Sequence, residues 1–187
     1  MACYNEGIEA GERNDWEAAA RRFRELVGQD PSLIEGWNGL GIALLRQGKT
    51  EEAGNAIETA LSMDPEYPSA LMNEGILRLS EGRNPEAAEL FSRSAFLDPG
   101  RPAHRVNLAI AQSRQGLLAE AEETLIAARR RFPSDADVLY HLGTVYERMG
   151  KRARAAEGYS AFLAVSNGKR SALERSVRER LREWGVE

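Results

Sequence analysis

The chain has 187 residues, of which 29% are charged and 42% are hydrophobic, and its formal net charge at pH 7 is −4. This balance suits a soluble folded protein and excludes an intrinsically disordered chain. No stretch approaches the roughly 20 consecutive apolar residues of a membrane-spanning helix, so that class is excluded too.

The first residues, 1–13, carry three glutamates and lack a basic region followed by an apolar run, so they do not resemble a signal peptide. We therefore expect a cytoplasmic protein, or a periplasmic or membrane-anchored one if an N-terminal segment was removed. The single cysteine, Cys3, allows no internal disulfide, and we expect it to fill space in the core. Under the alternative, Cys3 would be the lipid-bearing residue of a lipoprotein.

Comparison of the sequence with itself reveals a period of about 34 residues. Prolines recur at this constant interval at Pro31, Pro65, Pro99 and Pro133. Glycines keep the same period at Gly48, Gly82, Gly116 and Gly150. Because both residue types interrupt regular structure, each unit has two stop signals. We predict five units within residues 1–168, at about 1–33, 34–67, 68–101, 102–135 and 136–168.

Two helices are predicted in every unit, as the second unit illustrates. Residues 33–47 place Trp37, Leu40 and Leu44 at helical spacing, and a second apolar face begins after Gly48. β-Branched runs of period two are absent, so no sheet is predicted.

The segment 169–187 departs from the period and predicts one more helix. From Ser171 onward, one face is apolar, and arginines alternate with glutamates on the rest. A helix with one apolar and one charged face fits the end of a repeat array, where it caps the last unit. The apolar face consists of Leu173, Val177, Leu181 and Trp184.

The recurring residues resemble the tetratricopeptide repeat family. The second unit carries the signature nearly whole, in Trp37, Leu40, Gly41, Leu44, Ala53, Ile57, Ala60 and Pro65. The first unit is the most degenerate, with Glu6 where the family prefers an apolar residue. The resemblance covers about residues 1–167. It implies an all-α fold, a right-handed α-solenoid of five helix hairpins, with residues 169–187 as a C-terminal capping helix.

The resemblance also implies a binding groove, lined by the first helix of each hairpin. The family's groove-facing offsets select a polar row consisting of Asn5, Gly39, Asn73, Asn107 and His141, with Asn38 beside the gap. The next row is apolar and consists of Ile8, Ile42, Ile76, Ile110 and Thr144. A further row is basic and consists of Arg46, Arg114 and Arg148.

These rows suit a polypeptide ligand. An Asn amide both donates and accepts hydrogen bonds, so it can pair with a peptide backbone, while the arginines attract acidic side chains. The alternative is structural: Asn is common at this offset throughout the family, and the Ile row would be partly buried between hairpins.

No catalytic constellation is present. His104 and His141 form no pair at metal-ligand spacing, and turns and helix crossings account for the glycines. The run Arg129–Arg131 stands at a predicted helix end, where the helix dipole favours cations. The basic clamp with which some relatives grip a C-terminal carboxylate is not matched in any frame. We expect no enzyme, no cofactor, no metal and no nucleic-acid partner.

We therefore expect an adaptor or scaffold that binds a peptide or helix of another protein. A self-assembling scaffold is the alternative, because residues 1–100 carry a net charge of −9 and residues 101–187 a net charge of +5. An RNA-binding array is a third class, weakened because the aromatic residues mostly occupy packing positions.

Overall fold

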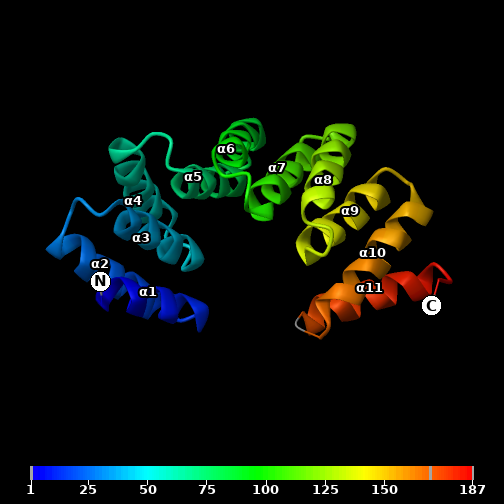
Figure 1. Cartoon of the computed structure of the whole chain (residues 1–187), viewed down its shortest axis with the longest axis horizontal. Coiled ribbons are helices and arrows are strands. Elements are labelled where there is room, and N and C mark those ends of the chain that lie inside the picture. Colours follow the sequence, from blue (N-terminus) through cyan, green and yellow to red (C-terminus); the bar gives the residue numbers. More distant parts are fainter. Residues whose placement is uncertain (1, 169, 187) are drawn as a thin grey trace. The chain divides into compact units, whose positions relative to one another are not determined.

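The structure, a computed structural model, describes residues 2–168 and 170–186, and within these ranges it contains eleven α-helices and no strand (Figure 1). The helices pack as five consecutive hairpins followed by one further helix, which confirms the predicted all-α solenoid. The helices are α1 (Ala2–Glu12), α2 (Trp16–Gln29), α3 (Ile34–Arg46), α4 (Thr50–Met63), α5 (Pro68–Ser80), α6 (Asn84–Leu97), α7 (Pro102–Arg114), α8 (Leu118–Arg131), α9 (Ala136–Arg148), α10 (Arg152–Ser166) and α11 (Ser171–Glu183).

The chain forms two compact units, Met1–Asp98 and Pro99–Glu187. The N-terminal unit contains α1 to α6 and the C-terminal unit contains α7 to α11. Four of the hairpins turn through a glycine with a positive φ of 73° to 83°, a backbone conformation that residues with a Cβ rarely adopt. This requirement explains why glycine recurs at the same place in four repeats, while Asn14, with a φ of 59°, takes that place in the first.

The two helices of a hairpin approach closely because a large side chain lies directly on a glycine. A Cβ placed on Gly75 of α5 would lie 2.6 Å from Cε1 of Phe91 on α6. The same relation joins Gly41 to Ile57, with 2.6 Å to Cγ1, and Gly143 to the ring of Tyr159. Such contacts give the crossing its short interhelical distance.

In the N-terminal unit, the core follows the buried faces of the second helices. Phe91, Ile57 and Ala53 are 0% exposed, and Phe23 is 4% exposed. Cys3 is partly buried and packs against this core, as expected for a space-filling residue. The residues thus exclude water where neighbouring hairpins meet.

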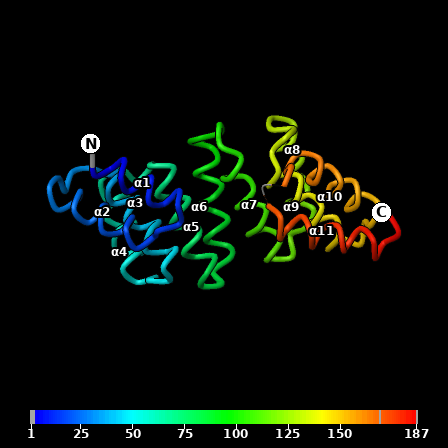
Figure 2. Tube along the Cα trace, turned by 90° about the horizontal axis from the view of Figure 1, so that it is seen from below, coloured from blue at the N-terminus to red at the C-terminus, as the bar shows by residue number. Residues whose placement is uncertain are grey.

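In the C-terminal unit, α11 packs on α10 and closes the core, as predicted from its apolar face (Figure 2). Val177 and Leu181 are buried, and the Trp184 ring lies 6.0 Å from that of Tyr159. The Glu174 carboxylate accepts hydrogen bonds from the backbone N–H groups of Gly168 and Arg170, at 3.0 and 3.3 Å. The start of α11 is thereby fixed.

The first prediction concerns Gly75. We expect Gly75→Ala to lower the free energy of unfolding by about 1–3 kcal/mol, because the new methyl group would overlap the buried Phe91 ring. Gly28 is the matched control, since it is also helical and nothing lies within 4 Å of a Cβ there. Gly28→Ala should raise stability by about 0.5 kcal/mol through helix propensity. Urea unfolding followed by circular dichroism measures both, and equal effects would contradict the crossing.

The second prediction concerns the Arg170–Asp137 pair, which links the start of α11 to α9. Nη2 of Arg170 donates to Oδ2 of Asp137 at 2.8 Å, and Nη1 donates to Oδ1. This pair holds the pKa of Asp137 below its ordinary value of 3.8, although burial opposes the shift. A lowered pKa contributes stability above the ordinary value, and this contribution is lost as the pH falls through the folded-state pKa.

We therefore expect Arg170→Gln to destabilise the protein at pH 7 but not at a pH below the folded-state pKa of Asp137. The loss at pH 7 should stay below about 1 kcal/mol, because solvent screens a carboxylate that is 45% exposed. Urea unfolding at the two pH values measures the difference. A loss that persisted unchanged in acid would contradict the assignment to this ion pair.

Candidate functional site

The sequence-predicted site residues lie on the first helices of the hairpins, and in the N-terminal unit the structure joins two of them. Nδ2 of Asn73 on α5 donates to Oδ1 of Asn38 on α3 at 2.6 Å. Both side chains are buried, with exposed fractions of 2% and 7%. This hydrogen bond satisfies both buried amides and orients α3 against α5. The two residues therefore support the surface of the first helices without forming part of it.

Gly39 explains why the polar row is interrupted at α3. A Cβ on Gly39 would lie 2.6 Å from the Phe23 ring of α2, and a Cβ on Gly7 of α1 would lie 2.9 Å from it. The ring of Phe23 therefore occupies the space that a side chain at position 39 would need. The adjacent Asn38 carries the amide instead.

The remaining predicted residues of the N-terminal unit differ in exposure. Asn5 and Arg46 are exposed, whereas Ile42 and Ile76 are partly buried. The Arg46 guanidinium lies 5.4 Å from the centroid of the Trp16 ring, which is a cation–π contact.

Ile42 and Trp16 line a largely apolar hollow of about 280 Å³ that extends from α1 to α3. The lining of this α1–α3 hollow consists of Gly7, Ile8, Gly11, Glu12, Trp16, Ala19, Phe23, Gly39, Ile42 and Ala43.

In the C-terminal unit, four predicted residues line one hollow of about 240 Å³ between α7 and α9. These are Ile110, Arg114, His141 and Arg148. The other lining residues of this α7–α9 hollow are Ala109, Ser113, Leu125, Tyr140, Thr144 and Val145. Asn107 of the polar row is partly buried on α7 and lines neither this hollow nor the α1–α3 hollow.

The α7–α9 hollow combines apolar walls with a fixed cation. Nη1 of Arg148 on α9 donates to the backbone oxygen of Ser113 on α7 at 2.6 Å, and also to the Ser113 hydroxyl. These bonds hold the guanidinium across the two helices, and its other N–H groups make no hydrogen bond that the structure records with the described residues. A fixed guanidinium with free donors suits a carboxylate.

Burial favours the neutral form of the imidazole in this hollow. Burial lowers the pKa of His141 below its ordinary value of 6.5, although the nearby carboxylate of Asp137 opposes the shift. The Tyr140 ring meets the imidazole edge to face, with centroids 5.1 Å apart. Sequence analysis missed Tyr140, because it lies outside the three rows that the family offsets select.

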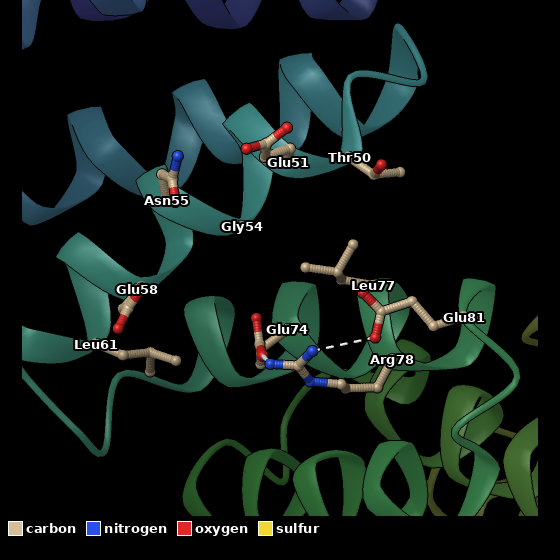
Figure 3. Close-up of a pocket in the computed structure, with 10 residues that line it drawn as sticks. All are labelled: Thr50, Glu51, Gly54, Asn55, Glu58, Leu61, Glu74, Leu77, Arg78 and Glu81. Carbon is tan, nitrogen blue, oxygen red and sulfur yellow. Dashed lines mark hydrogen bonds and ion pairs between the residues drawn. The ribbon is translucent and has the colours of Figure 1, made fainter.

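A third recess, the α4–α5 cleft, was not predicted (Figure 3). It measures about 560 Å³. Its lining consists of Thr50, Glu51, Gly54, Asn55, Glu58 and Leu61 of α4 and Glu74, Leu77, Arg78 and Glu81 of α5. A signal was available in the repeat register, since Glu74 and Arg78 stand one repeat after Leu40 and Leu44.

Within residues 2–168 and 170–186, no three or more His, Cys, Asp or Glu side chains gather as a metal-ligand group. None of the helices that the structure describes combines the length and the apolar character needed to cross a membrane.

Comparison with solved structures shows the same fold in several proteins. TTC0263, a TPR protein of Thermus thermophilus, has a TM-score of 0.81 at 16% identity, over 96% of this chain and 95% of that one. PilF of Pseudomonas aeruginosa has a TM-score of 0.77 at 18% identity, over 98% and 90%. YrrB, described as a TPR protein with an unusual peptide-binding site, has a TM-score of 0.65 at 20% identity, over 94% and 91%.

Comparison with sequences gives the family directly. No curated protein sequence matches the chain. Family models of the tetratricopeptide repeat match residues 4–56 and 38–102, residues 78–140 and residues 137–165. Because these matches run over most of its length, the chain belongs to the tetratricopeptide repeat family.

Proposed function

We propose that the chain is a protein-binding scaffold, and that its first helices hold a peptide or helical segment of a partner protein. Membership of the tetratricopeptide repeat family supports protein–protein interaction as the general function. The peptide-binding site named in the description of YrrB is consistent with a peptide ligand.

The observation that carries this proposal is the α7–α9 hollow. Ile110 and Tyr140 offer apolar contact, and the guanidinium of Arg148 is already oriented by Ser113. An oriented cation loses little conformational entropy when it binds a carboxylate. The ligand we infer is a segment with an apolar side chain next to an acidic residue or a C-terminal carboxylate.

The other first-helix residues extend this proposal into the N-terminal unit. Asn5, Ile42, Arg46 and Ile76 would supply further contacts there, and Asn107 would do so on α7. We assign Asn38 and Asn73 a positioning role, because each is at most 7% exposed and they hydrogen-bond to each other.

Selection from a displayed peptide library tests the α7–α9 hollow. We expect the whole chain to enrich peptides with an apolar residue beside Asp, Glu or a free C-terminus. Arg148→Gln should weaken a selected peptide by about tenfold or more, because a charge-assisted hydrogen bond is lost. Arg130→Gln removes the same charge from an exposed position on α8 and should change affinity less than about twofold. Equal losses in the two variants would contradict the site.

A second candidate function is self-assembly, favoured by the charge distribution. The acidic excess of nine lies in the N-terminal unit and the basic excess of five lies in the C-terminal unit. Opposite charges on two units of one chain attract neighbouring copies at low ionic strength. We expect a self-assembling chain to show a larger mass by sedimentation at low salt than at high salt. A monomer mass under both conditions would contradict this function.

A further inference from the structure

The α4–α5 cleft carries charge at positions that are apolar in the second and fifth hairpins. Leu40 and Leu44 stand one repeat before Glu74 and Arg78, and they are 5% and 1% exposed. In the last hairpin the same offsets hold Leu142 and Tyr146, which are buried as well. On α5, the Glu74–Arg78 ion pair therefore occupies two positions that hold buried apolar residues in the second and fifth hairpins.

The absence of a side chain at Gly54 deepens the cleft. The equivalent residues of the first and fifth hairpins are Ala20 and Ala156, both buried. A Cβ on Gly54 would lie 3.3 Å from Cδ2 of Leu77, which is tighter than ordinary contact. All three positions thus lack the buried apolar side chain that the fifth hairpin has at the same offsets, and such departures from local packing rules gather at functional sites.

The charge in the cleft is acidic and only partly neutralised. Arg78 pairs with Glu74 and, at 3.0 Å, with Glu81. Glu51 and Glu58 on the α4 wall are exposed and form no ion pair with any residue that the structure describes (Figure 3). Four glutamates against one arginine leave a net charge of −3.

The spacing of the Glu51 and Glu58 carboxylates indicates how far apart two cationic groups of a ligand must be. Glu51 and Glu58 are seven residues apart on one face of α4, which corresponds to about 10 Å along the helix. In a polyproline II segment, which has three residues per turn and rises about 3.1 Å per residue, side chains three positions apart lie on one face and span about the same distance. Leu61 and Leu77 line the same cleft, where they can contact the aliphatic stems of Lys or Arg.

We propose that the α4–α5 cleft is a second docking site, which binds a polyproline II segment of a partner protein bearing two Lys or Arg residues three positions apart. Charge complementarity at a cleft with apolar contacts supports this occupant. The site shares no residue with the α7–α9 hollow and selects the opposite charge, so the two proposals stand or fall separately. The acidic N-terminal unit would also steer such a segment toward the cleft.

Titration of the isotope-labelled whole chain tests the proposal by NMR. The probe is a peptide with two arginines three positions apart in a background of Ala and Ser. We expect shifts of backbone amides concentrated in residues 50–61 and 74–81. A peptide of the same composition with adjacent arginines should bind several-fold more weakly, because it cannot reach both carboxylates.

Paired variants separate the cleft from general charge attraction. Glu51→Gln with Glu58→Gln should weaken the probe about tenfold. Glu66→Gln with Glu89→Gln removes the same charge from exposed positions of the N-terminal unit outside the cleft, and should change affinity less than twofold. Equal weakening by the two pairs would show attraction by net charge alone and overturn the site.

A filling variant distinguishes loss of the site from loss of the fold. Gly54→Leu places a side chain in the cleft between Glu51 and Glu58 and leaves both carboxylates in place, so we expect loss of probe binding with an unchanged far-ultraviolet circular dichroism spectrum. Probe binding that survives in this variant overturns the proposal. If concentrating the protein alone produces the same shifts, the occupant is a second copy, and the proposal of a separate basic partner fails.

Discussion

In four of the five hairpins, the contact that sets the helix crossing is a large side chain packed directly on a glycine, and in the fourth hairpin Ala109 stands at the position of that glycine. Phe91 on Gly75 and Tyr159 on Gly143 bring two helix backbones together at a distance that a Cβ would prevent. The cost of placing glycine inside a helix is about 1 kcal/mol, which the burial of a large side chain offsets. The binding surfaces follow from this crossing, because it fixes which faces of the first helices remain uncovered.

Regular features of this fold could be predicted because they repeat. The constant interval between Pro31, Pro65 and Pro99 indicates paired helices without reference to any single contact, and the apolar face of Val177 and Leu181 indicates the closing helix. Family offsets also brought Ile110, Arg114, His141 and Arg148 to one hollow, since equivalent positions on neighbouring first helices must lie near each other.

The features that sequence analysis missed are those that break the period. Asn38 and Asn73, which are 35 residues apart, hydrogen-bond to each other. The amide of the second unit is at position 38 and not at position 39, because the Phe23 ring fills the space beside Gly39. The sequence left open whether these amides bind a ligand or serve the fold, and only side-chain packing could reveal that they hydrogen-bond to each other. The α4–α5 cleft likewise arises from substitutions at Gly54, Glu74 and Arg78 that a search for matches to the pattern passes over.

The contact of one Phe23 ring with Gly7 and Gly39 has a consequence for synthesis of the chain. The Phe23 ring of α2 contacts α1, which is synthesised before α2. It also contacts α3, which is synthesised after α2. One side of the Phe23 ring therefore has no helix to cover it until α3 has been synthesised. The first hairpin therefore gains full burial of this ring only when the second hairpin packs against it.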